Sequence, residues 1–267
     1  MKDELLTLVS SKDGYNTKLN IMREYLQAFI LRILFKNNFF KHAAFLGGTC
    51  LRFIYDVKRF SEDLDFSLQL KELFDFDKTI RFLTTELENS GYSISIKIKK
   101  NSIYSALIKF PGILYEAKMS DRKEENLSIK IDLDTNPPAG ARIKQHIINK
   151  HFLFGVTCYD LSTLFAGKIN AVLTRNYAKG RDYYDLFWYM TTHRGLEPNI
   201  EFLKNALAQF NWQGNLNNNE DWKRAVIETT QHADWRKIQK EIELLIEDPY
   251  EMNVFTKDNF LLLFNHL

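Results

Sequence analysis

The segment from Phe45 to Leu68 constrains the fold of this chain more than any other part of the sequence. A short apolar run, 42–46, reads as a buried strand and ends in Gly47-Gly48, where small residues let the backbone turn tightly. The pattern from Thr49 to about Asp56 predicts a short helix, and 64–68 predicts a second strand. We therefore expect a strand, a tight turn, a helix and a strand in close succession.

The Gly47-Gly48-Thr49 turn has the chemistry of a phosphate-binding site. Backbone N–H groups at the start of a helix, together with the Thr49 hydroxyl, form a natural cradle for phosphate oxygens. Such a turn is weak evidence by itself, since many glycine turns serve only packing.

Asp63 and Asp65 flank one apolar residue, Leu64, at the start of the second predicted strand. Residues i and i+2 of a strand project to the same face, so both carboxylates point the same way. Two like charges so placed repel each other, and a divalent metal ion relieves that repulsion. The alternative is that one aspartate caps a turn while the other is solvated. Because the pair follows a Gly-Gly-Thr turn and a helix, we favour a metal site.

Asp132 is the candidate for a third carboxylate. Residues 127–134 alternate between apolar and polar side chains, which predicts a strand with Asp132 on its polar face. In the same sheet as the first two aspartates, Asp132 would complete a two-metal site. Asp134 lies on that face too, but a turn at 135–138 follows it, so capping of this turn explains it better.

The other patterns in the first part of the chain indicate helices and strands around these motifs. The predicted elements are helices over 17–40 and 70–90, and strands over 92–98, 104–110 and 127–134. Residues 143–159 mix short apolar runs and give no assignment. Pro-Pro-Ala-Gly at 137–140 is the strongest break in the pattern, so we place the end of the sheet domain near or after it.

The C-terminal part of the chain is predicted to be helical, and four charged residues stand out there. Lys168 and Arg175 lie on one stripe of a helix, where the alternative for Lys168 is a solvated lysine with a packed stem. Asp182 and Asp185 face together near the start of the next helix, where they complement its dipole. Capping and an ion pair with Arg175 or Arg181 explain these aspartates as well as a functional role does.

Composition limits the class of protein but does not identify it. The formal net charge of +2 neither requires nor excludes nucleic acid, so any basic surface has to be local. Two cysteines are too few for a disulfide framework or a four-cysteine zinc site. The first residues do not resemble a signal peptide, and the apolar clusters fall short of the ~20 residues that span a bilayer. We expect a cytoplasmic protein that does not bind membranes.

Together these motifs resemble a known family. The strand, Gly-Gly-Thr turn and helix, followed by Arg59-x-Ser61-x-Asp63-x-Asp65, resemble the first motif of the DNA polymerase beta-type nucleotidyltransferases. More narrowly, the chain resembles the AbiEii/AbiGii toxins of bacterial toxin–antitoxin and abortive phage infection systems, which also have a strand aspartate matching Asp132. Later motifs of this group match Lys168-x-x-Ala171-x-x-x-Arg175 and Arg181-Asp182-x-x-Asp185-Leu186. The four motifs, in this order, are specific as a set.

The resemblance implies an α+β fold. A polymerase beta-like core, with a mixed sheet flanked by helices, is expected over 1–155. A helical domain over 156–267 would contribute Lys168 and the Arg181-Asp182 motif.

The resemblance also implies roles for the motif residues. Asp63, Asp65 and Asp132 would hold two Mg²⁺ ions, and Asp132 would help to deprotonate the attacking hydroxyl. Lys168 would neutralise the triphosphate from across the cleft, and Asp182 would be a further catalytic residue. The nucleotide-binding residues implied are Gly47, Gly48, Thr49, Arg59, Ser61, Lys168, Arg181 and Asp185.

The function that the resemblance implies is that of a toxin. It would move a nucleoside monophosphate from a nucleoside triphosphate to an acceptor, with tRNA expected, and release pyrophosphate. A cognate antitoxin protein would be its partner. A small-molecule nucleotidyltransferase of the antibiotic-modifying type is the first alternative, and a non-catalytic nucleotide-binding or interaction protein is the second. The presence of all three carboxylates argues against the second.

Overall fold

The computed structural model describes residues 1–70, 72, 74–218 and 220–265, which form two compact units. The first unit comprises 1–54, 60–136 and 145–158, and the second comprises 55–59, 137–144 and 159–267. The chain therefore passes between the units several times, and the short segment 55–59 belongs to the second unit although the first unit precedes and follows it.

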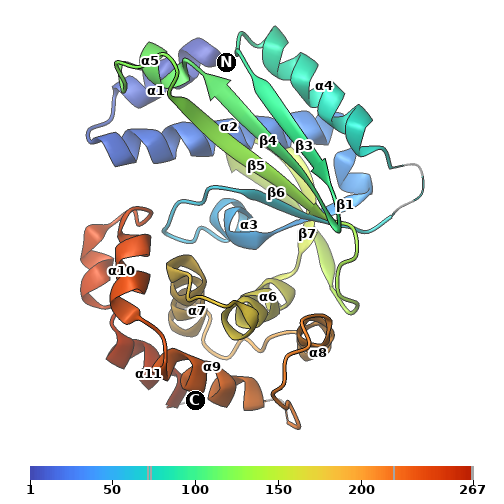
Figure 1. Ribbon diagram of the computed structural model, residues 1–267, viewed down its shortest axis with the longest axis vertical. Helices are drawn as coiled ribbons and strands as arrows, with labels where there is room; N and C mark the ends of the chain where they lie inside the picture. Colours follow the sequence, from blue (N-terminus) through green and yellow to red (C-terminus); the bar gives the residue numbers. More distant parts are fainter. Residues whose placement is uncertain (71, 73, 219, 266–267) are drawn as a thin grey trace. The chain divides into compact units, whose positions relative to one another are not determined.

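A seven-stranded mixed sheet is the centre of the first unit (Figure 1). The strand order is β3-β4-β5-β2-β1-β7-β6. β2 pairs parallel with β5 and β1 parallel with β7, whereas β1–β2, β3–β4 and β4–β5 are antiparallel. The strands are β1 (Ala43–Leu46), β2 (Leu64–Leu68), β3 (Ser95–Lys100), β4 (Ile103–Pro111), β5 (Asn126–Asp134), β6 (Ile143–Lys150) and β7 (Phe152–Tyr159). This mixed sheet with flanking helices confirms the predicted α+β class.

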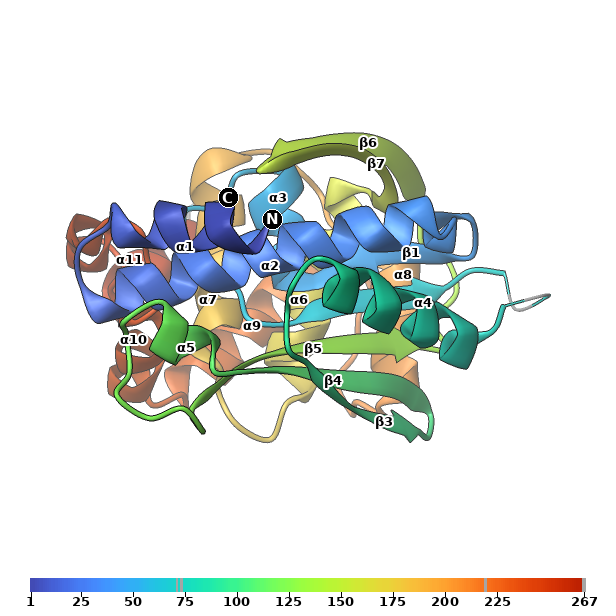
Figure 2. The same ribbon diagram turned by 90° about the horizontal axis from the view of Figure 1, so that it is seen from above.

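Helices α2 and α4 run side by side in this unit (Figure 2). On β4 and β5, the apolar residues Ala106, Ile108, Ile129 and Ile131 of one face are fully or almost fully buried. Their polar neighbours on the same strands project to the opposite face, as the alternation predicts. The helices are α1 (Lys2–Ser10), α2 (Tyr15–Lys36), the 3₁₀ helix η1 (Phe39–Lys41), α3 (Gly47–Ile54), α4 (Phe76–Asn89) and α5 (Ile113–Glu116).

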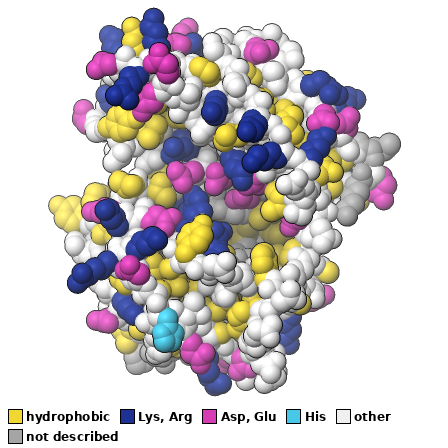
Figure 3. Space-filling view, in the orientation of Figure 1, with side chains coloured by type: hydrophobic (Ala, Val, Ile, Leu, Met, Phe, Trp, Pro, Cys, Tyr) yellow, Lys and Arg dark blue, Asp and Glu magenta, His cyan; other side chains and the backbone are white. Residues whose placement is uncertain are grey.

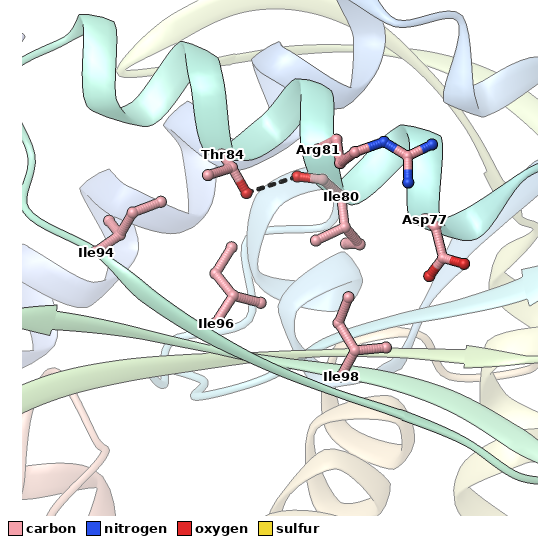
Figure 4. A pocket seen from close by; sticks show the side chains of 7 residues that line it. All are labelled: Asp77, Ile80, Arg81, Thr84, Ile94, Ile96 and Ile98. Carbon is pink, nitrogen blue, oxygen red and sulfur yellow. Dashed lines mark hydrogen bonds between the residues drawn. The ribbon is translucent and has the colours of Figure 1, made fainter.

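One side of β3 faces α4. Three isoleucines of this segment, Ile94, Ile96 and Ile98, point toward Ile80 of the helix and line a pocket with it (Figure 4). Because side chains alternate along a strand, the polar residues between these isoleucines point away from α4. The edge of the sheet therefore has one apolar face turned toward a helix, with a pocket between them, and one polar face.

Three segments differ from the prediction. The helix expected over 70–90 begins at Phe76. The Asp75 side chain caps it by accepting a hydrogen bond from the Lys78 N–H at 3.0 Å. Leu73, which was expected in this helix, lies outside the described residues. The strand expected over 92–98 is shifted to β3, since its register follows its pairing with β4. Residues 143–159, left unassigned, form β6 and β7, which are joined at His151 with φ +62°.

The second unit is helical, as predicted. Its helices pack through aromatic rings, including a stack of Phe165 on Tyr189 with centroids 4.4 Å apart. Gly180 starts α7, where a Cβ would overlap the backbone of α10 at Ile238. No described helix is both long and apolar enough to cross a membrane. The helices are α6 (Leu161–Thr174), α7 (Gly180–Thr192), α8 (Ile200–Gln209), α9 (Asp221–Gln231), α10 (Trp235–Glu243), the 3₁₀ helix η2 (Pro249–Asn253) and α11 (Lys257–Asn265).

A buried glutamate joins three elements of the first unit. Glu24, on α2, accepts from Arg52 Nε of α3 at 2.6 Å. Lys150 Nζ lies 3.4 Å and His151 Nε2 lies 3.2 Å from the same carboxylate, at the end of the β6–β7 hairpin. Burial alone would raise the pKa of Glu24, but the hydrogen bond with His151 and the charges of Arg52 and Lys150 lower it to about 2.

We expect Glu24→Gln to destabilise the protein by on the order of 3 kcal/mol at neutral pH. The pKa of the carboxylate falls from 4.5 to about 2 on folding, so its contribution is complete above pH 4.5 and disappears toward pH 2. Denaturant unfolding of both proteins at several pH values measures this difference, which must shrink as the pH falls. Glu88→Gln, at an exposed position of α4, is the control. A pH-independent difference would contradict the ionic explanation.

Candidate active site

The glycine turn is in direct contact with the second aspartate. Helix α3 begins at Gly47, whose φ is +80°, two residues earlier than predicted. A Cβ at this position would overlap the Asp65 carboxylate, so only glycine fits both the backbone and the space. Gly48 and Thr49 follow as buried residues of the first helical turn.

Thr49 connects the turn to the first aspartate. Its side chain is buried, and its hydroxyl donates a hydrogen bond to the backbone carbonyl of Asp63. The hydroxyl therefore holds the Asp63 segment in place, and the backbone N–H groups at the start of α3 remain the phosphate-binding feature of the turn.

We expect Gly47→Ala to lower catalytic activity by about 100-fold, because a displacement of about 1 Å at a reacting group costs that much. The added Cβ pushes the Asp65 side chain aside and strains the backbone at positive φ. Gly167→Ala is the matched control, since a Cβ there, in α6, meets no atom within 4 Å. Steady-state kinetics and circular dichroism of both variants test the prediction, and equal activities would refute it.

Two of the three predicted carboxylates lie on one face of the sheet, and the third lies just before β2. Asp65 on β2 and Asp132 on β5 are direct partners in the parallel pairing of these strands, and Asp63 lies two residues before Asp65. Neighbouring strands are about 4.8 Å apart, so the Asp65 and Asp132 side chains start from adjacent positions. The register therefore brings together residues that are far apart in the sequence.

Asp132 has two hydrogen-bond donors next to it. The Ser105 hydroxyl donates to Asp132 Oδ1 at 2.6 Å, and Lys130 Nζ donates to Oδ2 at 2.6 Å. The hydrogen bond and charge of Asp132, together with the charges of Asp63 and Asp65, raise the pKa of Lys130. All three carboxylates thus act on one ammonium group, which counters their mutual repulsion.

This donor set fits a hard divalent cation such as Mg²⁺, which prefers carboxylate oxygens. In their present orientation, no three Asp, Glu, His or Cys side chains among the described residues form a metal-binding group. Both oxygens of Asp132 accept hydrogen bonds, one from Ser105 and one from Lys130. The pairing of Asp65 with Asp132 on adjacent strands, and the cation that Asp132 already holds at Lys130, support a metal here.

A second cluster of charges lies in the helical unit. Arg59 and Asp185 form a bidentate ion pair, with Nε–Oδ1 and Nη2–Oδ2 distances of 2.6 Å, and both side chains are 0% exposed. Lys168 Nζ lies 2.7 Å from Asp185 Oδ2 and 3.0 Å from Asp182 Oδ1. Arg175 Nε lies 3.1 Å from the other oxygen of Asp182. Burial would raise the pKa of Asp182, but the charges of Lys168 and Arg175 lower it.

The predicted residues therefore fall into two groups. The first unit holds the three carboxylates and the Gly47-Gly48-Thr49 turn, while the second holds Arg59, Lys168, Asp182 and Asp185 with their ion pairs. Arg181 occupies the first turn of α7 and is half-buried. Ser61 is buried, and its carbonyl accepts from Gln27 Nε2 at 3.1 Å. Sequence reasoning overlooked Ser105 and the role of Lys130, although both occupy polar positions of alternating strands.

The mixed sheet, with carboxylates on adjacent strands beside a glycine turn, defines a nucleotidyltransferase. The chain belongs to the AbiEii family, described as the nucleotidyl transferase AbiEii toxin of a type IV toxin–antitoxin system, whose profile matches residues 29–257. It is thus a toxin-type nucleotidyltransferase, as the motifs predicted.

Solved structures share the fold. JHP933 from Helicobacter pylori is 16% identical with a TM-score of 0.52, and 90% of each chain is covered. MenT4, a nucleotidyltransferase toxin from Mycobacterium tuberculosis, is 15% identical with a TM-score of 0.55, covering 100% of this chain and 90% of that one. No curated protein matches the chain in sequence. At these identities the likeness concerns the fold.

Proposed function

We propose that this enzyme transfers a nucleoside monophosphate from a nucleoside triphosphate to a hydroxyl group of RNA, with tRNA as the expected acceptor. The observation that carries the proposal is the pairing of Asp65 with Asp132 on adjacent strands, next to the turn at Gly47. This arrangement offers anionic ligands and a phosphate-binding helix start in one place.

The reaction is an in-line displacement at the α-phosphorus. The acceptor oxygen forms a bond to this phosphorus while the bond to the α–β bridging oxygen breaks, and pyrophosphate leaves. Mg²⁺ held by Asp63, Asp65 and Asp132 would stabilise the charge on the attacking and leaving oxygens. Asp132 accepts the hydroxyl proton, and Ser105, which donates to Asp132 Oδ1, orients this carboxylate.

The other predicted residues divide into binding and positioning roles. The backbone N–H groups of the turn bind the phosphates, while the Thr49 hydroxyl positions Asp63. Arg59 is too deeply buried to meet a ligand and instead anchors segment 55–59 through Asp185. Lys168, with 12% of its side chain exposed, supplies positive charge to the triphosphate.

We expect Lys168→Ala to raise the apparent KM for the triphosphate by about 10- to 100-fold, as a charged hydrogen bond contributes about 1.5–3 kcal/mol. Lys168→Met is the matched control because it removes the ammonium but keeps the packed stem. Titration with the triphosphate and denaturant unfolding of both variants separate the two causes. An unchanged triphosphate affinity in either variant would remove Lys168 from the site.

A labelling experiment tests the proposed reaction. Purified protein, Mg²⁺ and each triphosphate, labelled at the α- or the γ-phosphate, are incubated with total cellular RNA and protein. Transfer of the α label alone to RNA of tRNA size is expected. Transfer of the γ label would indicate phosphoryl transfer and refute the proposal. Label found only in small molecules would favour the antibiotic-modifying alternative.

We further propose that a cognate antitoxin protein counteracts the enzyme in the cell. The match to a type IV toxin–antitoxin family supports this partner. Expression of the chain should arrest growth, and co-expression of the product of the neighbouring gene should relieve the arrest. An Asp65→Ala variant that still arrests growth would separate toxicity from nucleotide transfer and contradict the proposal.

A further inference from the structure

Four lysines share the polar face of the sheet with the carboxylates. β3 contributes Lys97 and Lys99, β4 contributes Lys109 and β5 contributes Lys130. The strand register determines that these residues are on one face. Lys97 pairs with Leu107, which pairs with Lys130, and Ser95 pairs with Lys109. We call Lys97, Lys99, Lys109 and Lys130 the lysine surface.

The lysine surface is a local concentration of positive charge. Lys97, Lys99 and Lys109 are exposed, and within the described part of the chain no ion pair neutralises them. On this face, β3 and β4 contribute serine, leucine, isoleucine and proline besides lysine, and no acidic residue. Figure 3 shows Lys and Arg side chains gathered over the strands of the sheet. Because the net charge of the whole chain is only +2, any basic surface has to be local, and the lysine surface is such a local surface.

The lysine surface continues directly into the carboxylate site. Lys99 pairs with Ser105, and Ser105 pairs with Asp132, so these three residues form one row across β3, β4 and β5. Each step across the sheet is about 4.8 Å, which puts the Lys99 backbone about 10 Å from that of Asp132. A polymer lying on the lysines therefore has its end within reach of Asp132.

We propose that the lysine surface binds the sugar–phosphate backbone of the RNA acceptor and leads its reacting hydroxyl to Asp132. The inference rests on the proposed function and adds where the acceptor binds. Lysines and hydroxyl side chains are the usual donors to phosphate oxygens, and Ser95, Ser105 and Ser128 lie among the lysines.

The composition of this face disfavours a protein partner. The centre of a protein–protein interface is enriched in aromatic residues and depleted in lysine. This face has no aromatic residue on β3 or β4, because Tyr104 and Phe110 are at the alternate positions of β4. The paired strands also hold the lysine backbones in a fixed spacing, which suits a regular array of phosphates.

A triple variant, K97A/K99A/K109A, tests this surface. None of these lysines touches the carboxylates, so the apparent KM for the triphosphate should stay unchanged while that for RNA rises. The matched control is K12A/K41A/K78A, which removes three exposed lysines from the helical side of the same unit. Equilibrium binding of total tRNA, without triphosphate, is measured between 0.05 and 0.3 M salt, at roughly 0.15 M for the main comparison.

Each lost phosphate contact lowers the slope of log K against log salt by about 0.7–0.9. Loss of three contacts should therefore weaken binding by about 50- to 170-fold at ~0.15 M salt and reduce the slope by about 2–3. The control variant should bind like the unsubstituted protein. Thermal unfolding of both variants shows that they are folded.

The outcomes separate this inference from the proposed function. Transfer to RNA by the unsubstituted protein, with equal RNA affinity in the triple variant, overturns the lysine surface and leaves the function intact. Lysine-dependent binding of an acidic protein or of anionic vesicles, but not of tRNA, also overturns it. Lysine-dependent tRNA binding with no label in RNA supports the surface and overturns the proposed function alone.

Discussion

Replacing Asp65 with alanine is expected to reduce nucleotide transfer by about 1000-fold, corresponding to about 4 kcal/mol of transition-state stabilisation. Asp65 pairs with Asp132 across β2 and β5 and packs against Gly47, so it belongs to both the carboxylate group and the phosphate turn. The free energy of unfolding should change by less than about 1 kcal/mol, since like charges repel here. Initial rates with the α-labelled triphosphate measure the loss.

Asp134→Ala is the matched control for this prediction. Asp134 lies on the same strand and face as Asp132, but its Oδ1 accepts from the Asn136 N–H at 2.8 Å, confirming the predicted turn cap. Loss of this bond should cost about 1 kcal/mol of stability and leave transfer nearly unchanged. Wild-type transfer rates in Asp65→Ala, or equal losses in both variants, would refute the assignment of Asp65.

Replacing Arg59 with alanine is expected to destabilise the protein by about 3–5 kcal/mol, because it leaves the buried Asp185 without its bidentate partner. Both side chains are 0% exposed, so water cannot replace the lost hydrogen bonds. The isolated bridge between Arg59 and Ile246 holds the backbone of the same segment. Denaturant unfolding measures the effect.

A double-mutant cycle with Asp185→Ala tests the physical cause. If the buried pair is the reason, the double variant should be more stable than the sum of the single losses predicts, by at least about 1 kcal/mol. An apolar pair, Arg59→Met with Asp185→Leu, should recover part of the stability. Additive losses would show that the two residues act independently, contrary to the structure.

Local patterns in the sequence were sufficient for most elements. Alternation placed Asp132 and Asp134 on the polar face of β5, and the apolar spacing of the helices gave α2, α6 and α7. The same reasoning left β6 and β7 unassigned, because β6 keeps no regular alternation and β7 alternates only from Leu153 to Cys158. Local patterns also placed β3 too early in the sequence. An exposed edge strand is positioned by its partner strand more than by its own pattern.

The sequence by itself determined the chemistry: three carboxylates, a Gly-Gly-Thr turn and a set of charged residues on later helices. The tertiary structure decided which of these residues meet. Asp65 faces Asp132, Arg59 meets Asp185 from 126 residues away, and three lysines of β3 and β4 lie on the carboxylate face. Strand register and burial are non-local properties, set by hydrogen-bond ladders and packing between distant segments, so no local pattern contains them.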